Sequence, residues 1–181
     1  MATDVEGVDG SASVASDAGQ VLERDALVRA VHAAKSDGRV VVTTNGCFDL
    51  LHVGHVRYLE QARRFGHLLV VGVNDDESVR RLKGSGRPVL PDVERAEILA
   101  ALSCVDYVTI FHEATPCELL DVLRPDIHVK GGDYAIDEVV EREVVEKHGG
   151  RVVLGIHVPV QSTTDVIKAI RRGFAEEADD E

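Results

Sequence analysis

The sequence predicts an α/β fold, a three-layer sandwich in which a five-stranded parallel sheet lies between helices. Short runs rich in valine, isoleucine and leucine alternate along the chain with segments of helical pattern. A strand that is buried on both faces of a parallel sheet is typically apolar throughout, as these runs are. The alternation favours right-handed β-α-β units. A length of 181 residues suffices for one domain with a sizeable core but not for two.

Five strands and six helices are expected in order along the chain. The strand candidates are the short apolar runs Arg39–Thr44, His67–Val73, Val105–Phe111, Asp126–Lys130 and Arg151–Val158. The helix candidates are the segments between and after these runs, at about His52–Phe65, Asp75–Lys83, Pro91–Leu102, Thr115–Leu123, Asp137–His148 and Thr163–Arg172. Ligands of an open parallel sheet bind beyond the carboxyl ends of its strands, where the strand order reverses. We therefore expect the chemistry in the segments that follow Thr44, Val73, Lys130 and Val158.

Negative charge is concentrated at the two ends of the chain. The net charge is −12, but the first 25 residues hold six acids and one arginine, and the last eight hold five acids. We predict that residues 1–20 form a disordered acidic leader, residues 21–173 the folded domain and residues 174–181 an acidic tail. The folded part is then nearly neutral, so that a local basic pocket can still bind an anionic ligand.

Several classes of partner are excluded by composition. The chain has no Trp, three Tyr and four Phe, too few aromatics for a platform that stacks single-stranded bases, so no nucleic acid is expected. Its three cysteines form no C-x-x-C pair, which favours a reducing cytoplasm. Neither a secretory signal nor an apolar run of about 18 residues is present, so no membrane partner is expected.

The most informative segment runs from Thr43 to His55 and joins the first predicted strand to the first predicted helix. Its two histidines, His52 and His55, stand three residues apart and so share one face of the helix's first turn. Free backbone N–H groups and the helix dipole favour a phosphate there, and imidazoles can donate hydrogen bonds to it. A histidine cap, a surface pair and a metal pair are the alternatives. No further ligand stands at a recognised zinc spacing, so no metal site is expected.

The string GCFDLLHVGH at residues 46–55 resembles the Gly-x-Phe-Asp-x-x-His-x-Gly-His signature of the cytidylyltransferase-like nucleotidyltransferases. The similarity continues through VVGVNDD at residues 70–76, KGGDY at 130–134 and STT at 162–164. It implies a Rossmann-like fold of nucleotidyltransferase type over about residues 39–170. Within that family the chain is similar to adenylyltransferases that activate D-glycero-β-D-manno-heptose 1-phosphate. Their activity is fused in many bacteria behind a sugar kinase, whereas only leader residues precede it here, so the stand-alone form is expected.

The resemblance implies that AMP passes from ATP, bound with Mg²⁺, to a sugar 1-phosphate, giving ADP-heptose and pyrophosphate. The acceptor phosphate is already an anion and needs no general base, which agrees with the lack of a nucleophile and base arrangement. The implied catalytic residues are His52, His55 and Lys83. The implied nucleotide-binding residues are Asn45, Gly46, Cys47, Phe48, His52, Gly54, His55, Arg95, Lys130, Gly131, Asp133, Ser162, Thr163 and Thr164. The implied acceptor-binding residues are Asp49, Arg87, Lys130 and Asp133.

Each of these residues has an ordinary structural alternative. Lys83 stands at a predicted helix end beside Gly84-Ser85-Gly86, where a flexible loop could carry it over the phosphates, but where a solvated lysine is also common. Arg95 could be part of a surface ion pair with Glu94. The Gly-Gly-Asp string at residues 131–133 is also typical of an ordinary turn, and Ser162 can cap the last helix. Relatives usually have Glu-Gly where this chain has Pro159-Val160, which leaves the preferred base open.

Two other functions compete with a sugar-phosphate adenylyltransferase. One is a cytidylyltransferase that acts on glycerol 3-phosphate or a similar small phosphate, because its first motif is nearly the same. The other is a nucleotide-binding regulatory module that has kept the pocket without the chemistry. Relatives of this size are commonly dimers, which implies a homodimer.

Overall fold

The computed structural model describes residues 19–131, 135–154 and 163–179, the last with side chains to Gly173. Within these residues six parallel strands form one sheet in the order β1-β4-β3-β2-β5-β6. The strands are β1 Gln20–Val21, β2 Val41–Gly46, β3 Leu68–Asn74, β4 Tyr107–Phe111, β5 Ile127–Lys130 and β6 Arg151–Leu154. The helices are α1 Arg24–Ser36, α2 Val53–Arg63, α3 Asp76–Lys83, α4 Asp92–Ala100, α5 Cys117–Leu123, α6 Arg142–Lys147 and α7 Thr163–Asp179, with a 3₁₀ turn at Ile136–Glu138.

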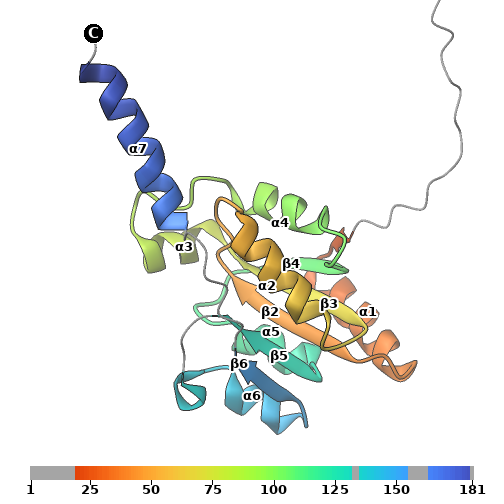
Figure 1. Cartoon of the computed structure of the whole chain (residues 1–181). Helices are drawn as coiled ribbons and strands as arrows, with labels where there is room; N and C mark the ends of the chain where they lie inside the picture. The colour runs from red at the N-terminus through yellow and green to blue at the C-terminus, as the bar shows by residue number, and fades with distance from the viewer. Residues whose placement is uncertain (1–18, 132–134, 155–162, 180–181) are drawn as a thin grey trace, which may run out of the picture.

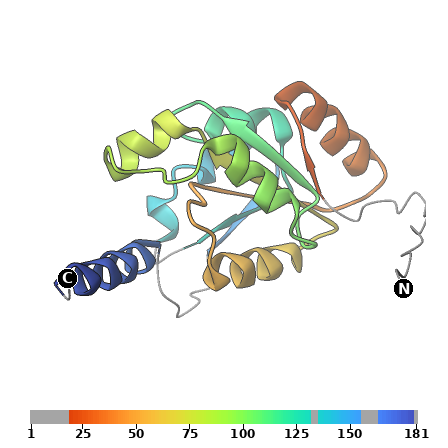
Figure 2. The same ribbon diagram turned by 90° about the horizontal axis from the view of Figure 1, so that it is seen from above.

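Helices cover both faces of the sheet, which confirms the expected three-layer α/β class. Every residue of β3 is buried, as a central strand between two helical layers requires. One core cluster joins the sheet to Leu59 of α2 and Leu99 of α4. A second cluster joins the other face to Leu27 of α1 and Leu123 of α5. Figures 1 and 2 show α2 and α1 on opposite sides of the sheet, with α7 projecting away from it.

The strand order reverses between β2 and β5. From β2 the chain adds β3 and then β4 on one side, and it returns to place β5 and β6 on the other side of β2. The register pairs Val42 with Ile127 and Thr43 with His128. The carboxyl ends of these two strands, at Gly46 and Lys130, therefore lie side by side at the same edge of the sheet. This is the position where an open parallel sheet binds its ligand.

The fold differs from the expected one mainly at its beginning. The sheet has six strands rather than five, because the short strand β1 pairs with the outer edge of β4. Helix α1 was not expected, although its buried Leu27, Val31 and Ala34 follow helical spacing. Helix α6 begins at Arg142 rather than Asp137, since a 3₁₀ turn precedes it. Helix α7 continues beyond Arg172 to Asp179.

The remaining expectations about the chain ends are not decided by the fold. The leader, up to residue 18, and the last strand beyond Leu154 lie outside the described residues. The division into leader, domain and tail stays a prediction. Over the part of the chain that is described, every helix is too short or too polar to cross a lipid bilayer.

We predict that Leu27→Ala lowers the free energy of unfolding by roughly 2–5 kcal/mol, because it removes a fully buried side chain from the second core cluster. Denaturant unfolding measures this change. Arg29→Ala, on the exposed face of the same helix, is the control and should stay within about 0.5 kcal/mol of the parent chain. Equal losses for the two variants would show that α1 is not docked as described.

Candidate active site

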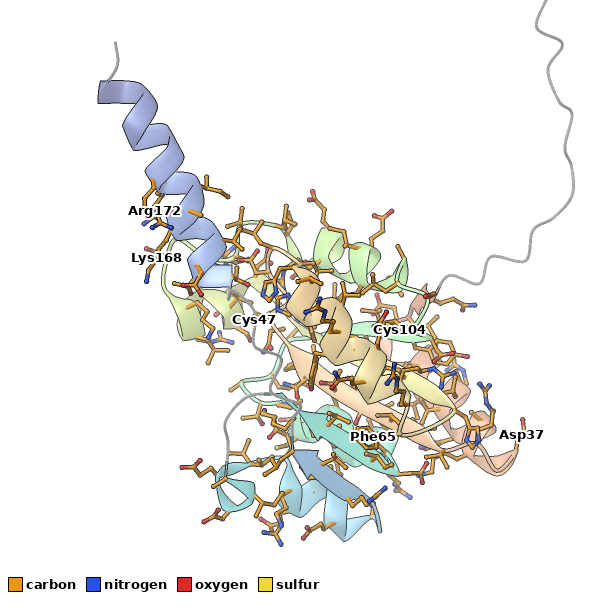
Figure 3. The ribbon with its side chains drawn as sticks, viewed as in Figure 1. Asp37, Cys47, Phe65, Cys104, Lys168 and Arg172 are labelled. Carbon is orange, nitrogen blue, oxygen red and sulfur yellow. The ribbon has the colours of Figure 1, made fainter. Side chains whose placement is uncertain are left out.

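The turn between β2 and α2 has an unusual backbone. Phe48 and Leu50 both adopt left-handed conformations, with φ of 46° and 50°, which residues other than glycine adopt only under constraint. The Phe48 side chain is buried, and its ring centroid lies 5.6 Å from that of His55. Figure 3 shows Cys47, in the same turn, close to the first turn of α2. The backbone of this turn is therefore constrained, and the turn fixes where α2 begins.

His52 and His55 cap α2 reciprocally. Nδ1 of His52, the N-cap residue, accepts a hydrogen bond of 3.1 Å from the Gly54 N–H, and Nδ1 of His55 accepts one of 3.4 Å from the His52 N–H. This is the geometry of a capping box, with imidazoles in place of the usual hydroxyl and carboxylate. The two ring centroids lie 3.9 Å apart, with 34° between the ring planes. The pair is thus brought together, as its spacing predicts.

The capping bonds decide which ring atoms can reach a ligand. Since each Nδ1 accepts a hydrogen bond, the neutral ring carries its proton on Nε2. Burial, followed by the neighbouring His52, lowers the pKa of His55 to about 4, and burial lowers the pKa of His52. Near neutral pH both rings are therefore uncharged Nε2–H donors. The backbone N–H groups of Gly54 and His55 are used within the turn, so the rings replace them as the donors available to a phosphate.

Asp49 ties this turn to the segment that follows α3. Its fully buried carboxylate pairs with the Arg87 guanidinium and accepts hydrogen bonds from the N–H groups of Val89, at 3.0 Å, and Leu90, at 3.2 Å. Burial alone would raise the pKa of Asp49, but the Val89 N–H, Arg87 and the Leu90 N–H together hold it below its usual value. Asp49 and Arg87, both expected at the acceptor, contact each other here.

Arg95 is a fully buried residue of α4 and not part of a surface pair with Glu94. Its guanidinium donates to the carbonyl oxygens of Leu90, Cys47 and Asn74, and to the Asp76 carboxylate at 2.8 Å. These partners belong to the turn before α2, the end of β3, the start of α3 and the segment before α4. Arg95 therefore holds four segments together around the β2–α2 turn.

Charged side chains act on the Cys47 thiol in this turn. Burial, the largest effect, raises its pKa, whereas the positive charges of Lys83, Arg95 and Arg87 act in the opposite direction and the negative charge of Asp49 raises it again. Lys83 is the last residue of α3 and is exposed, and Gly84 after it has a φ of 94°. Arg87 and Arg95 are each paired with a carboxylate, that of Asp49 and that of Asp76 respectively, which offsets their charge.

The place where the strand order reverses, between β2 and β5, is called the switch point. On its β5 side lie Lys130, Gly131 and Tyr58. The Tyr58 hydroxyl lies 2.7 Å from Thr44 Oγ1 and donates to the carbonyl oxygen of Val129 at 2.9 Å. Gly131 lies against the Tyr58 ring, where a Cβ would come within 3.0 Å of it. The Lys130 ammonium pairs with the buried carboxylate of Glu141. Glu141 was missed by the sequence reasoning.

The last predicted motif is only partly described. Thr163 opens α7, and its Oγ1 donates to the Asp49 carbonyl oxygen at 2.9 Å, which brings it to the β2–α2 turn. Thr164 is exposed. Asp133 and Ser162 lie outside the described residues. Asn45 stands at the end of β2, with its side-chain oxygen buried and without a partner among the described residues.

Metal ligands do not gather in the described residues. No group of three or more His, Cys, Asp or Glu side chains within them could hold a metal ion. The His52–His55 pair, with both Nδ1 atoms bound to backbone N–H groups, has only its Nε2 atoms to offer.

Comparison with known proteins places this site in a family. The family model described as cytidylyltransferase-like matches residues 43–173. The bifunctional protein HldE of Geobacter sulfurreducens is 56% identical over 158 residues, 87% of this chain and 32% of that protein. The protein of the same name from Azotobacter vinelandii is 53% identical over 153 residues, 84% of this chain and 32% of that protein. This chain thus spans about a third of the length of these curated relatives.

Solved structures confirm the fold class. The lipopolysaccharide core biosynthesis protein from Thermoplasma volcanium is 30% identical, with a TM-score of 0.55 over 65% of this chain and 94% of that chain. Pantothenate synthetase from Thermus thermophilus has a TM-score of 0.50 over 75% of this chain and 60% of that chain. Its 17% identity extends the likeness to the fold alone.

We predict that the His55 ring of the nucleotide-free chain titrates with a midpoint near pH 4, as burial and His52 dictate, and carries its proton on Nε2 at pH 7. The pKa of His55 in the folded chain lies below the ordinary histidine value of about 6.5. The stability that neutral His55 contributes is therefore complete above about pH 6.5 and is lost as the pH falls toward 4. Ring ¹H–¹⁵N NMR spectra measure both properties. A midpoint at or above 6.5, or a proton on Nδ1, would contradict the capping arrangement.

Proposed function

The chain belongs to the cytidylyltransferase-like family, and we propose that it transfers AMP from ATP to D-glycero-β-D-manno-heptose 1-phosphate, giving ADP-heptose and pyrophosphate. The motif set from residue 46 to residue 164 supports this acceptor by its resemblance to heptose 1-phosphate adenylyltransferases. The structural relative named for lipopolysaccharide core biosynthesis supports a sugar pathway. The partners in this proposal are ATP and the sugar phosphate, the compartment is the cytoplasm, and the chain forms a homodimer.

The observation that carries the proposal is the pair of neutral imidazoles at the start of α2. Their Nε2–H groups, fixed by the Nδ1 hydrogen bonds, can donate to the oxygens of the α- and β-phosphates. Such fixed donors need no reorganisation when negative charge develops on the transferring phosphoryl group. Neutral rings also avoid the repulsion and the loss of hydration that two buried imidazolium ions would have with ring centroids 3.9 Å apart.

In the proposed reaction, a phosphate oxygen of the acceptor attacks the α-phosphorus of ATP in line. A new P–O bond forms, and the bond from the α-phosphorus to the oxygen bridging to the β-phosphate breaks, so that pyrophosphate leaves. No proton has to be removed from the acceptor, so no general base is needed. His52 and His55 stabilise the charge on the transferring group, and Lys83 approaches the phosphates from the end of α3.

The other predicted residues act at the rim of the turn or support it. Asn45, Gly46, Cys47, Phe48 and Gly54 shape the nucleotide site through the turn in which they stand, and Gly131 and Thr163 border it just after β5 and at the start of α7. Lys130, the last residue of β5, lies where the nucleotide and acceptor sites meet in this proposal. Asp49, Arg87 and Arg95 hold that turn through their hydrogen bonds. Roles for Asp133, Ser162 and Thr164 rest on the resemblance alone. Mg²⁺ enters this proposal with the nucleotide, as the resemblance implies, and no step is assigned to it.

A pyrophosphate-release assay over a panel of sugar 1-phosphates, with ATP and CTP in parallel, tests the reaction. We expect turnover with ATP and D-glycero-β-D-manno-heptose 1-phosphate. Turnover with CTP alone would overturn the choice of nucleotide and favour a cytidylyltransferase. Binding of ATP in a calorimeter without pyrophosphate release from any acceptor would favour a regulatory module.

His55→Ala is expected to lower turnover by at least about 100-fold with the fold intact, because the variant loses a donor to the transition state. Steady-state kinetics measure the loss, and circular dichroism checks the fold. His32→Ala, an exposed histidine of α1 on the opposite face of the sheet, is the matched control and should keep the parent turnover. Unchanged turnover for His55→Ala would remove this ring from the active site.

A further inference from the structure

Glu141 is a buried carboxylate that the motif resemblance does not include. It precedes α6, its side chain is only 1% exposed, and its Oε1 contacts the ammonium of Lys130. Its second oxygen, Oε2, is buried and has no hydrogen-bond partner among the described residues. Lys130 is itself largely buried, with a side chain 20% exposed. One oxygen of the carboxylate therefore holds the lysine, while the other is left unsatisfied.

This ion pair is not explained by stability. Moving a carboxylate and an ammonium out of water has a large desolvation penalty, and well-packed apolar residues in their place are often as stable or more so. An unsatisfied buried oxygen adds a further penalty. A buried ion pair at the carboxyl end of a strand, where ligands bind, is a candidate for a functional role.

A second buried titratable side chain, that of His128, is affected by the charges of both Glu141 and Lys130. His128 lies two residues before Lys130 on β5 and is fully buried. Its Nδ1 is 2.9 Å from Thr43 Oγ1. Burial lowers the pKa of His128 to about 4, so that the ring is neutral near pH 7, although the charges of both Glu141 and Lys130 act on it. Its Nε2 also has no hydrogen-bond partner within the described residues. Among the ion pairs described for Glu141, its partner is Lys130.

The position of the Lys130–Glu141 pair places it on the acceptor side of the proposed reaction. His52 and His55 stand at the start of α2, which follows β2, and Lys130 stands at the end of β5, across the point where the strand order reverses. If the imidazoles hold the phosphates of ATP, in-line attack requires the acceptor phosphate to approach away from the leaving pyrophosphate. We place that approach on the β5 side, where Lys130 is a cation at the carboxyl end of the strand.

We propose that Glu141 is a positioning residue that fixes the Lys130 ammonium at the switch point, where it binds the phosphate of the acceptor. This inference rests on the proposed function. A lysine side chain has many rotamers and loses entropy when it is held in one of them. The buried carboxylate confines the ammonium in advance, and an ammonium with three N–H donors can hold a carboxylate and a phosphate oxygen at the same time. Glu141 itself does not touch the acceptor.

Glu141→Gln tests this role because the amide keeps the volume and removes the charge. We expect the KM for the sugar 1-phosphate to rise by at least about tenfold, since a charge-assisted hydrogen bond is replaced by a weaker one, while the KM for ATP stays within about twofold. Glu143→Gln, an exposed acid on the same helix, is the matched control and should match the parent chain in both constants.

A double-mutant cycle with Lys130→Met separates positioning from a structural role. If Glu141 acts through Lys130, the Lys130→Met/Glu141→Gln chain should have the same acceptor KM as Lys130→Met alone. A full additional loss in the double variant would overturn the proposal, as would parent-like constants for Glu141→Gln. If Glu141→Gln fails to fold, Glu141→Asp keeps the charge and withdraws it by one methylene. The aspartate variant should raise the acceptor KM, and a parent-like value would overturn the proposal.

The parent chain is assayed in the same series. Absence of turnover by the parent chain with every acceptor overturns the proposed function and this inference together. Turnover by the parent chain with an unaffected Glu141→Gln variant overturns the inference alone.

Discussion

The reciprocal hydrogen bonds between two imidazoles and the backbone at the start of α2 are the constraint on which the site depends. Each Nδ1 is occupied by a backbone N–H group, so each ring can offer a ligand only its Nε2–H. Two N–H groups of the kind that a helix start presents to an anion, those of Gly54 and His55, are used within the turn by Nδ1 of His52 and by the His52 carbonyl oxygen. The left-handed conformations of Phe48 and Leu50 and the contacts of Asp49 and Arg95 hold the turn in that geometry.

Charge is distributed around this turn so that neutral donors and fixed cations act together. The rings of His52 and His55 are kept neutral by burial, while the positive charges of Lys83, Arg95 and Arg87 act against the rise in the pKa of Cys47. Two of these cations are themselves held, Arg87 by Asp49 and Arg95 by Asp76. The net charge of −12 comes mostly from the chain ends and not from this turn.

The sequence sufficed for the layers, most elements and the pairing of His52 with His55 at the start of α2, because apolar runs, helical spacing and a specific motif are local signals. It did not lead to β1, whose two residues are ordered by pairing with β4. Helix α1 had a readable signal in Leu27, Val31 and Ala34, hidden by the neighbouring acidic leader. Asp49 and Arg87 are separated by 38 positions in the sequence, and Lys130 and Glu141 by 11 positions. Such contacts depend on how loops return to the sheet, which no local pattern encodes, and the same holds for the burial of Arg95.

A crystal structure of the chain with a non-hydrolysable ATP analogue tests the central claim most directly. We predict that Nε2 of His52 and Nε2 of His55 each lie about 2.7–3.2 Å from an oxygen of the α- or β-phosphate, with both Nδ1 atoms still bound to the backbone. A triphosphate bound away from the start of α2, or one held there with both Nε2 atoms turned from it, would contradict the account.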